Sequence, residues 1–146
     1  MPVVVVTEKL VVPAEQAWQA VVAVENYPER MDSVRRIECL ERAIGADGVE
    51  IALIGWEIEL DGSVLRWVER EHRDPAARRL TVEQVSGDLE IFRGSWTVAG
   101  TPDDGSEVTL SVEFEIGMAL LRDVLDGFAT EAIRNNSTAM LRSLER

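Results

Sequence analysis

The chain begins with a strand-like pattern that turns into a helical one. Val3 to Val12 is rich in β-branched residues, which predicts a strand ending at Pro13. Pro13 suits the first turn of a helix, whose apolar positions recur at helical spacing. These positions are Ala14, Ala17, Trp18, Val21 and Val22. Because Pro28 disfavours helix at Tyr27, we expect an interruption there and a second short helical turn from Glu29 to Met31.

A strand-like pattern with clear turns follows this helical region. Turn sequences lie at 45–48 (GADG), 61–62 (DG), 74–78 (DPAAR), 86–88 (SGD) and 100–105 (GTPDDG). Five turns separate six strands. Strands joined by tight turns pair antiparallel, so we predict an antiparallel meander.

The last part of the chain returns to a helical period. Between Met118 and Arg146 the stripe consists of Leu121, Val124, Leu125, Phe128, Ala132, Asn136, Ala139, Met140 and Leu144. The fold class is therefore α+β, with one long C-terminal helix laid across one face of a curved sheet. We find no repeat or linker, so residues 1–146 are predicted to form one domain.

Alternation within the predicted strands indicates which faces point inward. The inner positions are expected to be Val108, Leu110, Val112, Phe114 and Ile116, then Ala52, Ile54, Trp56, Ile58 and Leu60, then Phe92, Gly94, Trp96 and Val98. The stretch from Gly62 to Arg79 is different, because both of its faces carry charge. Leu65, Trp67, Glu69 and Glu71 share one face, while Arg66, Arg70 and His72 share the other.

Composition and charge limit the class of protein and its possible partners. The chain of 146 residues is 46% hydrophobic and 29% charged, as in ordinary globular proteins. Its formal net charge of −12 repels phosphate backbones, so nucleic acid is excluded as a partner. The single cysteine, Cys39, is expected to be a buried strand thiol. Without a signal peptide or a bilayer-length apolar run, we expect a cytoplasmic protein with no membrane insertion.

Several short motifs occur together in a recognisable order. They are "VVPAEQAWQAVVAVENYPERM" near the start, the "ECLER" strand, a Trp67 to Arg78 segment with "DP", a Gly87 to Trp96 strand, and "RNNSTAM" in the last helix. Together they resemble the START-like (SRPBCC, helix-grip) superfamily. The polyketide aromatase/cyclase branch is the most similar, followed by the coenzyme Q-binding branch.

The resemblance implies a curved sheet that grips the last helix around a deep hydrophobic pocket. The cyclase residue corresponding to Trp67 lines this pocket, which would place Leu65, Glu69 and Glu71 inside it. The sequence departs from the cyclase pattern at four positions. Glu69 replaces a small hydroxyl residue, Glu71 and Glu83 replace two arginines, and Val34 replaces a tyrosine.

Each candidate also has a purely structural interpretation. Glu69 and Glu71 either face the pocket or belong to a solvated strand end, cross-paired with neighbouring arginines. The tryptophans belong either to a core or to a pocket wall. Asn136 lies near the middle of the apolar stripe and would need buried partners. His72, the only histidine, is predicted to lie on the surface, with no catalytic triad and no metal site around it.

Two functions follow from the resemblance and the residues. As an enzyme, the protein would cyclise and dehydrate a poly-β-ketone, with Glu69 and Glu71 as acid and base. As a non-catalytic module, it would bind or transfer a quinone, lipid or aromatic metabolite. The predicted ligand-binding residues are Trp18, Tyr27, Met31, Trp56, Leu65, Trp67, Glu83, Phe92, Trp96, Leu110, Val112, Phe128 and Asn136. No cofactor or metal is expected. Carrier-protein delivery of the substrate and a monomer or homodimer are compatible with either function.

Overall fold

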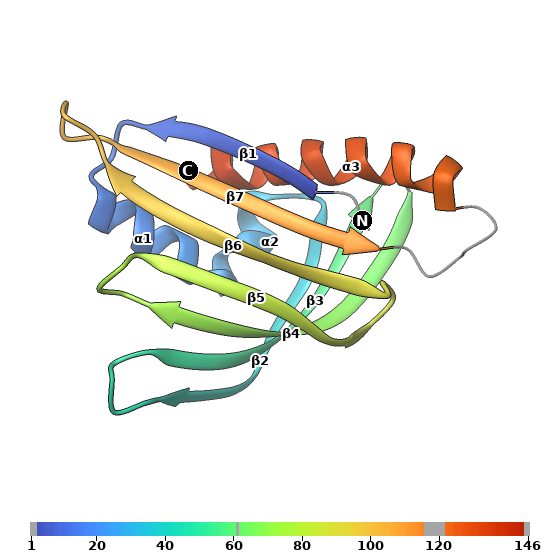
Figure 1. Ribbon diagram of the computed structural model, residues 1–146, viewed down its shortest axis with the longest axis horizontal. Helices are drawn as coiled ribbons and strands as arrows, with labels where there is room; N and C mark the ends of the chain where they lie inside the picture. Colours follow the sequence, from blue (N-terminus) through green and yellow to red (C-terminus); the bar gives the residue numbers. More distant parts are fainter. Residues whose placement is uncertain (1–2, 61, 116–121, 145–146) are drawn as a thin grey trace.

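A curved antiparallel sheet with helices on its inner face forms the protein (Figure 1). The computed structural model describes residues 3–60, 62–115 and 122–144, with the backbone alone for Leu60, Ser63 and 122–129. The sheet has seven strands in the order β1-β7-β6-β5-β4-β3-β2. The strands are β1 (Val3–Leu10), β2 (Val34–Ile44), β3 (Glu50–Leu60), β4 (Ser63–Asp74), β5 (Arg79–Gly87), β6 (Ile91–Gly100) and β7 (Ser106–Glu115). This confirms the predicted antiparallel meander, which β1 joins by pairing with β7.

Two short helices and a 3-10 turn connect β1 to β2. They are α1 (Ala14–Val22), η1 (Val24–Asn26) and α2 (Tyr27–Arg30). The expected interruption at Tyr27 is wrong, because Tyr27 has helical angles (φ −61°, ψ −39°) and begins α2. Pro28 then occupies the first turn of α2, where its missing N–H costs no hydrogen bond.

The long helix α3 (Arg122–Ser143) crosses the inner face of the sheet (Figure 1). It packs against β1, β7, β3 and α2. Its side chains Ile133, Met140 and Leu141 are buried, as is Leu144 directly after the helix. Arg142 pairs with Glu8 of β1 at 3.5 Å, and the Arg134 guanidinium donates to the Val5 carbonyl at 3.4 Å. These contacts fix the helix over one end of the inner face.

The inner faces are those that the alternation predicted. Every second residue of β7 from Ser106 to Phe114 is buried, as are Ala52, Ile54, Trp56 and Ile58 of β3. Ile116 lies outside the described residues, and the side chain of Leu60 is likewise not described. The prediction for Cys39 is wrong: its side chain is exposed, because β2 is an edge strand whose residues beyond Val34 are mostly open to solvent.

Candidate functional site

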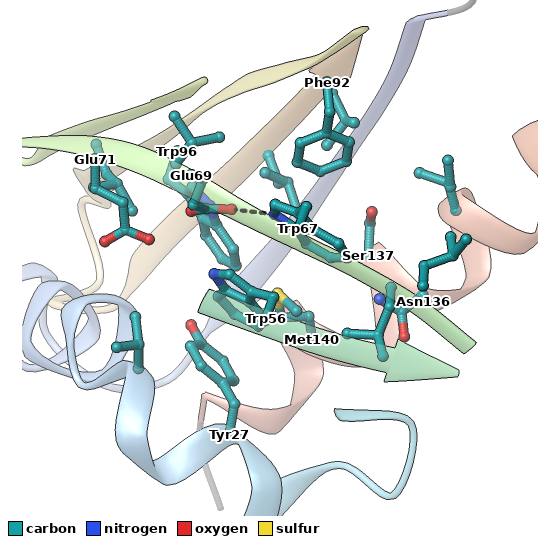
Figure 2. Close-up of a pocket in the computed structure, with 18 of the residues that line it drawn as sticks. Tyr27, Trp56, Trp67, Glu69, Glu71, Phe92, Trp96, Asn136, Ser137 and Met140 are labelled. Atoms are coloured by element: carbon teal, nitrogen blue, oxygen red, sulfur yellow. Dashed lines mark hydrogen bonds between the residues drawn. The ribbon is translucent and has the colours of Figure 1, made fainter. Parts of the chain in front are cut away.

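Five aromatic side chains converge between the sheet and the helices (Figure 2). The indoles of Trp56 and Trp67 stack with an interplanar angle of 5° and ring centroids 5.9 Å apart. Tyr27 tilts against Trp56 at 5.9 Å and against Trp96 at 6.4 Å. Phe92 tilts against Trp67 at 5.1 Å. Such stacked and tilted arrangements are the geometries that aromatic rings prefer.

Sheet register explains why Trp56 and Trp67 meet. They are directly opposed on the neighbouring strands β3 and β4, so both side chains project from the same face. Gly87 of β5 pairs with Trp67 from the other side. A side chain at Gly87 would place its Cβ 2.4 Å from the Trp67 Cβ, and its φ of +152° also favours glycine. Glycine at this position therefore gives Trp67 the space it occupies.

The aromatic rings form part of the wall of a cavity of about 70 Å³. Its wall contains the predicted Tyr27, Trp56, Leu65, Trp67, Glu69, Glu71, Phe92, Trp96, Leu110, Val112 and Asn136. The remaining lining residues are Val21, Val24, Ile58, Leu80, Val82, Leu89, Ile133, Ser137 and Met140. Most of the wall is hydrocarbon, so the few polar groups in it determine what chemistry it supports.

Glu69 and Glu71 are the two acidic groups in this wall, and both are buried. Their side chains belong to β4 residues with exposed fractions of 3% and 1%. The solvated strand end that was one of the two interpretations is therefore wrong. The Trp67 indole N–H donates a hydrogen bond to Glu69 Oε1 at 2.9 Å (Figure 2). The aromatic wall thus also orients one of the two carboxyls.

Arg73 provides the counter-charge for Glu71. Its Nε and Nη2 groups both donate to Glu71 Oε1, at 3.1 and 2.9 Å, and its Nη1 donates to Glu50 Oε1 at 3.2 Å. The Arg73 side chain is only 6% exposed. Glu50 also pairs with Arg42 at 2.9 Å, which links the buried charges to the surface. Glu71 Oε2 takes no part in the bonds to Arg73 and remains available to Glu69 or to a ligand.

Burial determines the protonation of Glu69. Loss of hydration raises its pKa well above the ordinary value, and the neighbouring Glu71 carboxylate adds to this through charge repulsion and a hydrogen bond. The hydrogen bond from Trp67 acts in the opposite direction and lowers the pKa by a smaller amount. Burial therefore favours the protonated form of Glu69, beside a Glu71 side chain that Arg73 bonds. Burial also raises the pKa of Tyr27, whose hydroxyl donates to the Val21 carbonyl at 3.2 Å.

The raised pKa of Glu69 predicts a pH-dependent stability. Between the ordinary value of 4.5 and the raised value, the folded protein binds more protons than the unfolded chain. The free energy of unfolding should therefore fall as the pH rises through this window, by at most about 1.4 kcal/mol per pH unit from this group. Urea unfolding at several pH values should show a shallower fall for Glu69→Gln than for the parent. If Glu69→Gln and the parent show the same slope of unfolding free energy against pH, the raised pKa of Glu69 is contradicted. The control is Glu83→Gln, which should keep the slope of the parent.

The helix α3 contributes the polar groups on the opposite wall. The Ser33 hydroxyl donates to Asn136 Oδ1 at 2.7 Å, so Asn136 is half-buried and has a polar partner. Ser137 and Met140 lie beside Asn136 in the wall (Figure 2). The sequence interpretation did not select Ile133, Ser137 or Met140 as ligand contacts. Ile133 and Met140 lie three residues before and four residues after Asn136, and Ser137 lies four residues after Ile133; this helical spacing was the signal that could have found them.

Three predicted ligand contacts do not belong to the cavity wall. Glu83 is exposed on the outer face, in a hollow also lined by Arg70, His72, Arg79 and Arg93. The alternation of β5 explains this correction, because Leu80 and Val82 point inward and Glu83 must point outward. Trp18 and Met31 are buried in the core but do not line the cavity. From the first two helices and the turn between them, Val21, Val24 and Tyr27 reach the cavity instead.

The remaining predictions concern the outer-face residues of β4 and the side chain of Phe128. Arg66, Arg70 and His72 are exposed on the outer face, as predicted. The side chain of Phe128 lies outside those that the structure describes. Among the described residues, no group of three or more His, Cys, Asp or Glu side chains is arranged to hold a metal ion. None of the described helices is both long enough and apolar enough to cross a membrane.

Solved structures with the same architecture define the class of fold. A START superfamily protein from Mycobacterium smegmatis superposes with a TM-score of 0.79 at 17% identity, covering 98% of this chain and 97% of that chain. The Zhui aromatase/cyclase from Streptomyces sp. R1128 superposes with a TM-score of 0.80 at 18% identity, covering 99% and 94% of the two chains. The fold is therefore the START-like helix-grip fold, as the sequence motifs suggested.

Sequence similarity identifies the family within this class. Residues 10–141 match the family described as "Polyketide cyclase / dehydrase and lipid transport", and the chain belongs to that family. The actinorhodin polyketide synthase bifunctional cyclase/dehydratase of Streptomyces coelicolor is 30% identical over 129 residues, which is 84% of this chain. The chain spans 39% of the length of that relative.

Proposed function

We propose that this protein is a polyketide aromatase/cyclase that promotes aldol closure and dehydration of a poly-β-ketone in its cavity. The observation that carries this proposal is the buried pair of Glu69 and Glu71 in an aromatic wall. A neutral acid beside a carboxylate combines the two groups that the reaction needs, one to donate a proton and one to accept it. The similarity to a cyclase/dehydratase supports the same reaction class.

The first half of the reaction forms the carbon–carbon bond. A Glu71 oxygen removes a proton from a carbon that lies between two carbonyls, which leaves an enolate. The enolate carbon attacks a second carbonyl carbon of the same chain. As that C–C bond forms, the Glu69 carboxyl gives its proton to the carbonyl oxygen, which becomes a hydroxyl. The proton on Glu71 then passes to the neighbouring Glu69 carboxylate.

The second half removes water. Glu71 takes the remaining proton from the same carbon, a C=C bond forms, and the hydroxyl leaves with the Glu69 proton as water. One further transfer from Glu71 to Glu69 restores the starting protonation. The aromatic rings hold the chain so that one pair of carbons meets, and such positioning is a large part of the rate advantage of an intramolecular reaction.

The cavity is too small for even a single aromatic ring unless side chains move. An apolar cavity of about 150 Å³ accommodates benzene, whereas the cavity of this protein measures about 70 Å³. We expect Met140 in its wall to move on binding, because an unbranched thioether side chain repacks at low cost. A substrate that closes to one aromatic ring is therefore the appropriate probe.

A second function remains a candidate because the apolar wall does not require chemistry. The cavity could bind and transfer a quinone, lipid or aromatic metabolite, with Glu71 serving only as the structural partner of Arg73. The family description includes lipid transport as well as cyclisation. If the protein is a cyclase, a carrier protein is the expected source of its substrate, since the similar relative is a polyketide synthase component.

Conversion of nonane-2,4,6,8-tetraone distinguishes the two functions. This linear ketone closes through an activated methylene and loses one water to give 2,4-dihydroxy-6-methylacetophenone. We expect the protein to accelerate formation of this product over the spontaneous reaction and over attack by oxygen, which gives pyrones. Liquid chromatography with mass detection separates these products. Saturable binding of the tetraone without any change in product rate or distribution would favour the transfer function.

A further inference from the structure

The indole N–H of Trp56 is a buried hydrogen-bond donor without a partner. Trp56 is 7% exposed, and its Nε1 atom is shielded from solvent with no acceptor in hydrogen-bonding position. Its stacking partner Trp67 differs, because the Trp67 N–H is bonded to Glu69. A buried donor without a partner destabilises the fold, so folded proteins rarely contain one.

The Trp56 nitrogen lies on the edge of its ring nearest to Glu69 (Figure 2). Trp56 is opposed to Trp67, and Glu69 follows two residues after Trp67 on the same face of β4. The Trp56 N–H lies close enough to the Glu69 carboxyl to lower its pKa, although the two groups do not make a hydrogen bond of normal geometry. Trp56, Trp67 and Glu69 therefore surround one small polar region in a largely apolar cavity.

We infer that Trp56 Nε1 and the Glu69 carboxyl form a subsite for one uncharged acceptor oxygen, the carbonyl oxygen of a planar ketone or quinone. The inference rests on the proposed function for the reaction but extends it to the ligand class and to the residue that selects it. Both groups donate: the indole through N–H and the neutral carboxyl through O–H. A carbonyl oxygen has two lone pairs and can accept from both donors at once.

The surrounding charges exclude other ligands from this subsite. The Glu71 carboxylate beside Glu69 would repel a fatty-acid carboxylate or a phosphate. Arg73 has no donor left to bind such an anion, because its Nε, Nη1 and Nη2 groups are directed to Glu71 and Glu50. An apolar hydrocarbon would leave the Trp56 N–H unsatisfied. A neutral ketone is the ligand that satisfies the donor without adding charge.

Two probes of matched shape test this subsite. Acetophenone and α-methylstyrene differ only by a carbonyl oxygen in place of a methylene carbon. Calorimetry should give the ratio of their dissociation constants for the parent, Trp56→Phe and Trp96→Phe. We expect Trp56→Phe to reduce the relative preference for acetophenone by about fivefold to tenfold, the value of one hydrogen bond. Trp96→Phe, which replaces another indole of the same wall, should keep the parent ratio.

The parent protein alone provides a second measurement if Trp56→Phe does not fold. In ¹⁵N-labelled protein, one of the four indole N–H resonances should move downfield with acetophenone and not with α-methylstyrene. Benzoate should bind more weakly than acetophenone. An unchanged ratio in Trp56→Phe, no ketone-specific indole shift, or tighter binding of benzoate would each overturn the inference. Acetophenone and α-methylstyrene do not react, so their binding tests the subsite alone. If the protein bound acetophenone as expected but did not convert the tetraone, the proposed function would be contradicted and this subsite would stand.

Discussion

Glu69→Gln should lower turnover of nonane-2,4,6,8-tetraone by a factor of about 10² to 10⁴, which is what general acid–base catalysis contributes. Glutamine matches the shape of the neutral acid and can still accept the hydrogen bond from Trp67, but it cannot supply a proton. Binding of the tetraone should remain within about threefold of the parent, because the cavity wall is unchanged. Steady-state kinetics should therefore show the loss in kcat rather than in KM.

Two measurements distinguish a loss of catalysis in Glu69→Gln from damage to the fold: its free energy of unfolding, and the turnover of a control variant on the outer face. Because burial favours the neutral acid over the carboxylate, the unfolding free energy of Glu69→Gln near pH 7 should equal or exceed that of the parent. Glu83→Gln is the same substitution on the exposed face of β5 and should leave turnover unchanged. If Glu69→Gln keeps full turnover, the acid is not part of the reaction, and the transfer function should replace the cyclase.

Arg73→Met should reduce the free energy of unfolding by about 3–5 kcal/mol, the usual cost of breaking a buried ion pair from one side. The substitution leaves Glu71 buried beside Glu69 without a counter-charge. Denaturant unfolding followed by circular dichroism measures the change. Glu71→Gln should also destabilise the protein, because Arg73 would then lose its buried partner. The two glutamates, which look equivalent in sequence, should therefore respond oppositely to the same substitution.

An exposed pair and a double variant provide the controls for Arg73. Arg66 pairs with Glu57 on the outer face at 2.7 Å, with its side chain 65% exposed. Arg66→Met should cost less than about 1 kcal/mol, because solvent screens the pair. Replacing Arg73 and Glu71 together with Met should recover most of the stability, since no uncompensated buried charge remains at these positions. An equal cost for Arg73→Met and Arg66→Met would mean that the buried pair has no structural role.

Local periodicity was sufficient to predict the strands, the long helix and the inner faces. Successive side chains of a strand point to opposite sides, so the positions of Trp56, Trp96 and Val112 follow from their neighbours alone. Both faces of β4 carry charge, so the inward direction of Trp67, Glu69 and Glu71 was inferred from the family resemblance instead. Glu83 was placed in the pocket because its position resembled that of a family arginine, and here the local alternation was the better guide.

The bonding partners of the buried charged side chains could not be predicted from local sequence patterns, because they depend on contacts between strands. Arg73 has the same parity as Glu69 and Glu71, so its inward direction could have been inferred from the sequence. Its bonds to Glu71 and Glu50 required the register of β3 against β4, which pairs Glu50 with Arg73 across the two strands. Whether the two glutamates lay in solvent or in the cavity likewise depended on which elements cover the inner face.

The sequence by itself determined the class of fold, the order of its elements and most of the aromatic positions of the inner wall, because these follow from short-range periodicity and turn chemistry. Only the tertiary structure decided that burial raises the pKa of Glu69, that Arg73 compensates Glu71 and that the Trp56 N–H has no hydrogen-bond partner. Protonation and hydrogen bonding depend on distance and burial, and these are fixed only when β3, β4 and α3 enclose one cavity.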